Sequence, residues 1–221
     1  DGGAWGTIKH FALNGQESHR FKIDAVCSER AIRQIYLKTF EMAVKAGTVK
    51  ALMTAYNPIN GHWAASNYDL CTTILRNEWG YDGIVMTDWW AKMNDVVEGG
   101  EESNQDTRDM VRSQNDLYMV VNNNGAEVNS NNDNTEESVK EGKLTVGELQ
   151  RAAINICNFI LSAPVIEREL IDTDIAKHFD SIPNDQAKYQ VFNVGKDDKV
   201  MFNSGTEATL EVEEEGEYTI I

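Results

Sequence analysis

Short apolar runs and longer stretches of helical periodicity alternate along the first 165 residues of this chain. The apolar runs predict strands over residues 5–12, 50–56, 83–88 and 116–121. A strand that is buried on both faces has a nearly continuous apolar sequence, as in the parallel sheets of α/β proteins. Because a helical pattern follows each predicted strand, the order indicates parallel strands joined by helices.

The predicted helices have recognisable starts and stops. A helix is expected over 28–47, where a serine at the start is a favoured N-cap and a glycine ends the apolar spacing. A shorter helix is expected over 67–80. The last is expected over 145–164, where Thr145 and Glu148 match a capping box and a proline closes the pattern.

The sequence changes character after residue 165. Residues 166–187 lack a helical period and are interpreted as a linker. Residues 188–221 alternate in strand fashion between glycines, which predicts the start of an antiparallel, β-rich domain of the sandwich type. Because β-sandwiches of many functions share this pattern, it assigns no binding role. The strands expected there are 189–194, 199–202, 208–212 and 218–220.

Two polar segments follow the third and fourth predicted strands. Residues 98–109 are acidic and are interpreted as a solvated loop leading into a helix. Residues 122–134 hold seven asparagines and are a loop by composition. The second loop could border a site at the end of the sheet, and a plain solvated loop explains it equally well.

Charge and cysteine usage restrict the partners. A net charge of −16 and a pI near 4.6 argue against nucleic-acid binding, because such a surface repels phosphate backbones. No apolar run reaches the ~18 residues needed to span a bilayer, so no membrane partner is expected. The cysteines, odd in number and scattered, predict buried thiols in a reducing, cytoplasm-like compartment. They are Cys27, Cys71 and Cys157.

No cofactor or metal is expected. The four histidines are dispersed without metal-ligand spacing, and no phosphate-cradling glycine loop is present. The chain begins at Asp1 without a methionine and stops within an apolar pattern, so we interpret it as part of a longer protein. A secretion signal therefore stays open, and the native location is unknown.

Candidate chemistry is concentrated in residues 83–91, where an apolar strand delivers Asp88 and two tryptophans follow. Enzymes built on parallel barrels place catalytic side chains just beyond the carboxyl ends of their strands. A carboxylate at this position can act as a nucleophile, and an indole ring can stack on a sugar. The alternative is that Asp88 caps the next helix and the tryptophans are core.

Other polar residues stand at the ends of the neighbouring predicted strands. Lys9 and His10 lie near the end of the first strand, and Tyr56 follows the second in a Pro/Gly turn. A helix with the sequence YLKTFEMAV and a lead-in LRNEWGYDG complete five linked motifs. In this order and spacing, about residues 5–165 strongly resemble glycoside hydrolase family 3, the β-glucosidase family.

The resemblance implies the second half of a truncated, parallel (β/α)₈ TIM-type barrel over residues 1–165, without its first four strands. It also implies that Asp88 is the nucleophile that forms a covalent glycosyl-enzyme intermediate. The positions that match sugar-binding residues of the family are Lys9, His10, Met53, Tyr56 and Trp89. The positions that continue the first motif, interpreted as support for the site, are Asn14, Gln16, Glu17 and Arg20.

The implied activity is retaining, exo-acting hydrolysis of terminal β-D-glucosides by double displacement, with an oligosaccharide or β-glucoside as substrate. A β-xylosidase or another exo-glycosidase of the family is an alternative, as is a non-catalytic carbohydrate-binding or structural fragment. The family's acid/base is a Glu on a separate α/β sandwich domain that nothing in this chain resembles. We therefore expect residues 1–221 alone to be inactive. The expected protein partners are the rest of the parent chain or a second copy.

Overall fold

The computed structural model describes residues 5–120, 128–167, 189–194 and 207–212. By their internal contacts the residues divide into two compact units, Asp1–Arg168 and Glu169–Ile221. The first unit carries the sheet and helices that position the candidate site.

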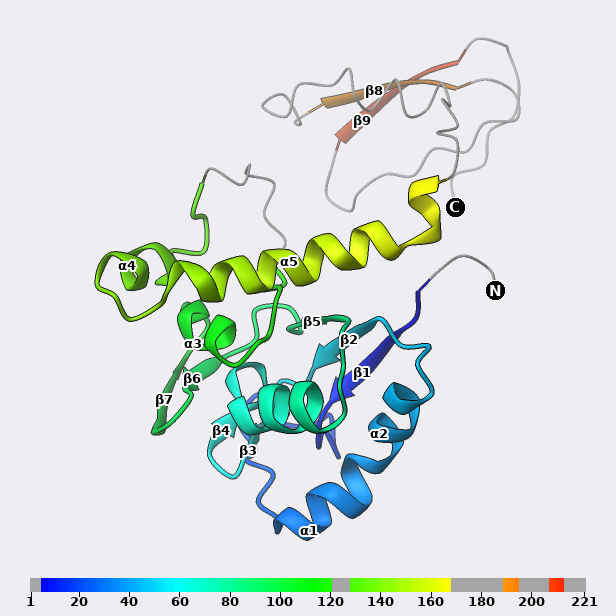
Figure 1. The fold of residues 1–221 in the computed structure, drawn as a ribbon. Helices are drawn as coiled ribbons and strands as arrows, with labels where there is room; N and C mark the ends of the chain where they lie inside the picture. Colours follow the sequence, from blue (N-terminus) through cyan, green and yellow to red (C-terminus); the bar gives the residue numbers. More distant parts are fainter. Residues whose placement is uncertain (1–4, 121–127, 168–188, 195–206, 213–221) are drawn as a thin grey trace. The chain divides into compact units, whose positions relative to one another are not determined.

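A three-stranded parallel sheet forms the centre of the first unit (Figure 1). Its strands are β1 (Thr7–Phe11), β2 (Ala51–Thr54) and β5 (Ile84–Met86), in the order β1-β2-β5. Phe11, Leu52 and Val85, one from each strand, are buried in the same cluster. The three predicted strands are confirmed. Both faces of β2 and nearly all of β5 are buried, as a continuous apolar run predicts, whereas Thr7 and Lys9 of the edge strand β1 are exposed.

The fourth predicted strand, over residues 116–121, does not form as expected. Residues 116–120 make one isolated parallel bridge, Met86 to Leu117, and no strand. The cause is Asp116, whose carboxylate Oδ2 accepts the Val85 N–H at 2.9 Å. A neighbouring strand would pair with that N–H through a backbone carbonyl. The side chain thus replaces a ladder hydrogen bond, and the segment lies beside β5 without extending the sheet.

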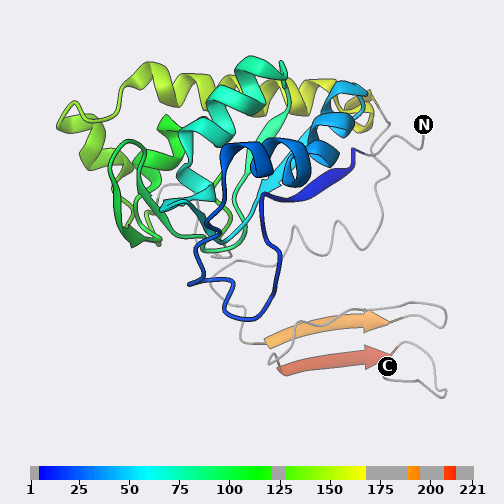
Figure 2. The same ribbon diagram turned by 90° about the horizontal axis from the view of Figure 1, so that it is seen from below.

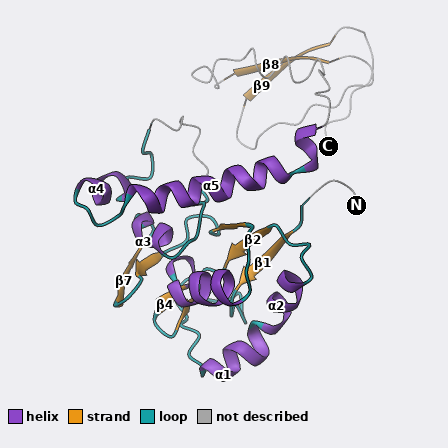
Figure 3. Cartoon of the chain, viewed as in Figure 1, coloured by secondary structure: helices purple, strands orange, loops and turns teal. Residues whose placement is uncertain are grey.

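The predicted helices are confirmed. The first spans α1 (Glu29–Ala31), η1 (Ile32–Tyr36) and α2 (Lys38–Lys45), and Ser28 caps it. The second is η3 (Asp69–Glu78), and the last is α5 (Val146–Ser162), which begins with the predicted capping box. Figure 3 shows these helices around the sheet, and in Figure 2 the long segment between β1 and α1 projects away from them.

Residues 98–109 were expected to form a solvated loop leading into a helix, and that helix is confirmed as α3. Residues 93–112 are nevertheless more ordered than a plain loop. They form a hairpin of β6 (Met93–Asp95) and β7 (Gly99–Ser103), followed by α3 (Thr107–Arg112). The buried Asn94 side chain holds the hairpin in place, since its Nδ2 donates to Gly61 O at 2.9 Å and to Gly100 O at 3.3 Å. The hydrogen bonds of the buried Asn94 amide therefore order a segment whose polar composition is typical of a loop.

Short elements complete the unit. A second hairpin, β3 (Pro58–Ile59) and β4 (His62–Trp63), leads into the 3₁₀ turn η2 (Ala64–Ser66). The remaining helical segments are α4 (Thr135–Lys140) and η4 (Pro164–Glu167). No helix in the described part of the chain is both long and apolar enough to cross a bilayer.

The three cysteines do not share one environment. Cys71 is buried and Cys27 is partly exposed, whereas Cys157 on α5 is exposed, so the prediction of three buried thiols is wrong. Apolar residues run around most of α5, and Ile154 and Leu161 are exposed as well. The sequence pattern therefore could not identify which side of this helix packs.

The second unit contains one described pair of strands, β8 (Tyr189–Val194) and β9 (Glu207–Val212). They pair in parallel, so the predicted antiparallel arrangement is wrong for this pair. A parallel pair needs a connection of about a dozen residues or more, and residues 195–206 are long enough to provide it. The predicted strands 199–202 and 218–220, and nearly all of the predicted linker, lie outside the described residues.

Candidate functional site

Asp88 lies two residues beyond the carboxyl end of β5 and is 7% exposed. The chain turns at residues 89–90 and continues into the β6–β7 hairpin. The next helix, α3, begins only at Thr107. The alternative that Asp88 caps a following helix is therefore wrong.

His10 is the partner of the Asp88 carboxylate. Its Nε2 lies 3.2 Å from Asp88 Oδ2, although the two residues come from opposite edges of the three-stranded sheet. The other oxygen, Oδ1, accepts the Trp89 N–H at 2.8 Å. The Lys9–His10 and Phe11–Ala12 peptide bonds beside this contact are cis. Asp88 is thus held at both oxygens, with a mostly buried imidazole at one of them.

Tyr56 completes a connected group with Asp88 and Trp89. Its hydroxyl donates to the Trp89 carbonyl at 2.8 Å. Burial and, next, the adjacent Asp88 carboxylate raise the pKa of Tyr56 to about 12. The hydroxyl is therefore protonated at every ordinary working pH and serves as a hydrogen-bond donor.

Arg20, which sequence reasoning assigned only to support, contacts the site directly. Its guanidinium lies 4.7 Å from the Tyr56 ring centre and 5.0 Å from that of Phe21. Glu17 holds Arg20 through an ion pair at 2.7 Å, and Asn14 donates to Glu17 at 2.8 Å. The segment after β1 therefore folds onto the Tyr56 ring through a chain of polar contacts.

Phe21 is a residue that sequence reasoning missed. Its ring packs edge-on against Tyr56 with the centroids 4.5 Å apart, and nearly half of its surface is exposed. The two residues are 35 positions apart and no periodicity links them. The nearest signal in the sequence was its place directly after Arg20, at the end of the first motif.

The remaining predicted sugar-binding residues lie at different depths. Met53 on β2 is buried and Trp89 is partly buried. Lys9 is exposed, and within the described part of the chain its amine makes no hydrogen bond or ion pair. The structure therefore connects His10, Tyr56, Asp88 and Trp89 through hydrogen bonds and a close charge contact, whereas Lys9, next to His10 in the chain, makes no hydrogen bond or ion pair with any of these described residues.

Thr87 anchors the backbone in front of Asp88. Its N–H donates to Leu117 O at 2.9 Å, and its Oγ1 accepts the Met119 N–H at 3.0 Å. The Trp90 N–H then donates to Met119 O at 2.9 Å. These bonds hold the backbone on both sides of Asp88 against residues 117–119, which lie within the fourth predicted strand. A threonine before an aspartate gave no hint of this role.

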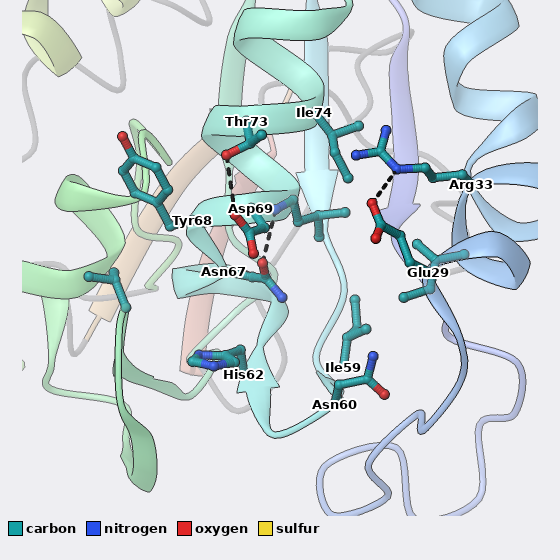
Figure 4. Close-up of a pocket in the computed structure, with 13 residues that line it drawn as sticks. Glu29, Arg33, Ile59, Asn60, His62, Asn67, Tyr68, Asp69, Thr73 and Ile74 are labelled. Atoms are coloured by element: carbon teal, nitrogen blue, oxygen red, sulfur yellow. Dashed lines mark hydrogen bonds and ion pairs between the residues drawn. The ribbon is translucent and has the colours of Figure 1, made fainter.

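A separate cavity of about 340 Å³ lies between α1–η1, the β3–β4 hairpin and the start of η3 (Figure 4). Asp88, His10 and Tyr56 are not among its lining residues. Across the described ranges, no three His, Cys, Asp or Glu side chains gather as metal ligands would. The cavity and the Asp88 group are therefore two distinct features.

Comparison with known proteins shows the family. Residues 2–159 match the family described as Glycosyl hydrolase family 3 N terminal domain. A β-glucosidase of Ruminococcus albus is 48% identical over 168 residues, which cover 76% of this chain and 17% of that protein. The chain belongs to glycosyl hydrolase family 3.

Solved structures that resemble this chain include β-glucosidases, in agreement with the family match. A β-glucosidase from Paenibacillus barengoltzii is 55% identical with a TM-score of 0.73, covering 97% of this chain and 24% of that one. β-Glucosidase 3B from Thermotoga neapolitana, solved with glucose, is 35% identical with a TM-score of 0.63, covering 80% of this chain and 24% of that one. The first unit thus has an α/β glycosidase fold. The chain spans about a quarter or less of these relatives.

Proposed function

We propose that this chain carries the nucleophile half of a retaining exo-β-glucosidase. Asp88 attacks the anomeric carbon and forms a covalent glycosyl-enzyme intermediate, which water then hydrolyses. The observation that supports this assignment is the buried Asp88 carboxylate at the end of β5, held by His10 at 3.2 Å and by the Trp89 N–H at 2.8 Å. An acceptor-only carboxylate with fixed oxygens is suited to in-line attack.

The neighbouring side chains have complementary roles in the proposal. Lys9 and His10 donate hydrogen bonds to sugar hydroxyls, and Met53 and Trp89 form apolar walls of the same subsite. The Tyr56 hydroxyl holds the Trp89 carbonyl and thereby the backbone next to the nucleophile. Arg20, stacked on Tyr56, fixes the position of that ring. Arg20 was named from sequence as a supporting residue, and its stacking on Tyr56 gives that support a physical basis.

The proposal also includes the domain arrangement. Residues 1–165 are the second half of a (β/α)₈ barrel, 166–187 a linker, and 188–221 the start of a β-rich domain. The order β1-β2-β5, with Leu117 bridged beside β5, supports four neighbouring barrel positions. The first half of the barrel and the acid/base Glu, roughly 5–5.5 Å from the nucleophile in retaining enzymes, come from elsewhere in the parent chain.

Substrate choice follows from the relatives' names. The β-glucosidase of Ruminococcus albus is 48% identical, whereas an exo-α-(1→6)-L-arabinopyranosidase of Bifidobacterium longum is 33% identical. This difference favours a terminal β-glucoside. A pentoside, as for a β-xylosidase or another exo-glycosidase of the family, is the second candidate, because pyranosides without the C6 hydroxymethyl occur among the relatives' named substrates.

The test is covalent trapping in the full-length parent. Incubation with a 2-deoxy-2-fluoro-β-glucoside should label one peptide, and that peptide should contain Asp88. Asp88→Asn should abolish labelling and lower turnover of an aryl β-glucoside by at least about 10³-fold, since the nucleophilic step is lost. The folded state, monitored by circular dichroism, should be unchanged. Label on another carboxylate would overturn the assignment.

A further inference from the structure

The cavity of Figure 4 has an apolar part and a polar part, and Glu29 and Arg33 line its α1–η1 side. Ile59 and Ile74 are buried and form the apolar part. Asn67, Tyr68 and Asp69, at the start of η3, form a polar and aromatic part. A volume of about 340 Å³ lies within the range of small-molecule sites, which join apolar surface to a few fixed polar groups.

Several polar groups in this cavity retain unused hydrogen-bonding capacity. Asn67 Oδ1 accepts the Leu70 N–H at 2.9 Å, which leaves its NH₂ group without a partner in the described part of the chain. Asp69 Oδ1 accepts from Thr73 at 3.2 Å, which leaves Oδ2 available. Neither the His62 ring nor the Tyr68 hydroxyl is hydrogen-bonded to any described residue. Hydrogen-bond donors and acceptors are therefore both available to a ligand in this cavity.

The charges exclude an anionic ligand. Arg33 is the only cationic side chain among the lining residues, and it already bonds Glu29 at 2.8 Å and Glu78 at 2.6 and 3.0 Å. Asp69 adds a carboxylate that no cation in the described ranges pairs with. A phosphate or carboxylate ligand would meet net negative charge and a cation that is already satisfied.

We propose that this cavity is a second saccharide-binding site, separate from Asp88, that takes a neutral mono- or disaccharide. A pyranose combines hydroxyls that both donate and accept with faces of C–H groups. Its hydroxyls match the Asn67 amide and the Asp69 carboxylate, and its C–H face matches the half-exposed Tyr68 ring. The choice of glucose as the first ligand to test rests on the proposed function, whereas the cavity itself does not.

Binding is measured on the full-length parent whose active site has been blocked covalently by the 2-deoxy-2-fluoroglucoside. Calorimetric titration with glucose should then detect one remaining site. Tyr68→Ala and Asp69→Ala should each weaken that binding about fivefold or more, through lost stacking and lost hydrogen bonds. Tyr36→Ala is the matched control: Tyr36 is on η1, outside the cavity lining, and is 44% exposed like Tyr68. It should leave the affinity unchanged.

Three results would overturn the proposal: no glucose binding to the blocked enzyme, equal loss in Tyr36→Ala, or a parent structure with its own chain filling the cavity. Equal thermal midpoints for the three variants would exclude unfolding as the cause of lost binding. If the fluorosugar labels nothing, the proposed function fails by itself. The titration on unlabelled protein still decides the cavity, because weaker binding in Tyr68→Ala but not in Tyr36→Ala supports it.

Discussion

The residues that surround Asp88 in the structure are remote from it in sequence. His10 is 78 positions before Asp88 and Tyr56 is 32 positions before it. The strands β1, β2 and β5 are parallel, so their carboxyl ends, which carry these residues, lie on the same side of the sheet. The Asp88 carboxylate is therefore fixed by the sheet, and the Trp89 backbone next to it is fixed by the Tyr56 hydroxyl. Loss of that hydroxyl should weaken the positioning of the nucleophile without removing any charge.

We predict that Tyr56→Phe in the parent enzyme lowers kcat/KM for an aryl β-glucoside about tenfold, the equivalent of one lost hydrogen bond near 1.4 kcal/mol. Because burial and the Asp88 carboxylate raise the pKa of Tyr56 to about 12, its hydroxyl stays protonated below that pH. Neither limb of the kcat/KM–pH profile should therefore move between pH 4 and about 10. Steady-state kinetics across that range provide the measurement.

The control for this substitution is Tyr118→Phe. Tyr118 also has its pKa raised to about 12 by burial, and its hydroxyl donates to Ala91 O at 3.3 Å rather than to the Trp89 carbonyl. Its loss should change kcat/KM by no more than about twofold. A shifted alkaline limb in Tyr56→Phe would contradict the prediction, because it would mean that Tyr56 titrates within the working range.

At the scale of elements, Asp116 explains both a wrong prediction and a source of stability. Its carboxylate accepts from Arg76 on η3 at 2.6 Å, from the Val85 N–H on β5 at 2.9 Å and from Asn155 on α5 at 2.8 Å. The side chains of Asp116 and Arg76 are almost fully buried. One carboxylate therefore joins a strand and two helices at the place where an additional strand was expected.

Asp116→Ala should lower the free energy of unfolding by ~3–5 kcal/mol, because it leaves Arg76 buried without its charge partner. Urea unfolding of the parent protein, monitored by tryptophan fluorescence, measures this. Glu136→Ala, which removes an exposed ion pair with Lys140 on α4, should leave the midpoint unchanged. Equal midpoints for the two variants would show that Asp116 does not connect these elements.

The sequence predicted elements well wherever local pattern and burial agree. The strands near 7–11, 51–54 and 84–86 and the capping box at Thr145 follow from patterns within a few residues. The position of the β6–β7 hairpin depends on Asn94, which bonds the Gly61 carbonyl 33 positions earlier in the chain. The parallel pairing of β8 and β9 is likewise not encoded in the alternation within either strand. Such non-local bonds leave no periodic signal.

In the candidate site, too, the sequence predicted what local motifs encode and missed what depends on contacts between distant segments. Asp88, Tyr56 and His10 stood in motifs at strand ends and were named from sequence. The stacking of Arg20 and Phe21 on Tyr56, and the anchoring of Thr87, arise from contacts between distant segments. A motif can name the reacting groups, because their type and spacing are tied to the strands. The first motif named Arg20 as a support but not the ring on which Arg20 stacks, because only the folded chain brings these segments together.

At the scale of the whole molecule, we propose that the elements with exposed apolar side chains pack against the rest of the parent chain. Ile154 and Leu161 are exposed on α5, and Ile35 and Met42 are exposed on the helix after β1. Isolated apolar residues are ordinary on a surface, but two outward-facing helices that both carry them are typical of an interface. The relatives from Ruminococcus albus and Paenibacillus barengoltzii are at least four times as long as this chain, which is consistent with such packing.

We therefore predict that residues 1–221 expressed alone do not hydrolyse cellobiose, while the full-length parent does so in the same assay. The nucleophile alone cannot protonate the leaving oxygen, and the proposal places the acid/base Glu outside this chain. A dinitrophenyl glucoside, whose leaving group needs little acid assistance, is the most favourable substrate, and even this should react slowly. Rapid hydrolysis of cellobiose by residues 1–221 would contradict the prediction. It would require an acid/base within the chain, and Glu17, already paired with Arg20 beside Tyr56, would be the first candidate to substitute.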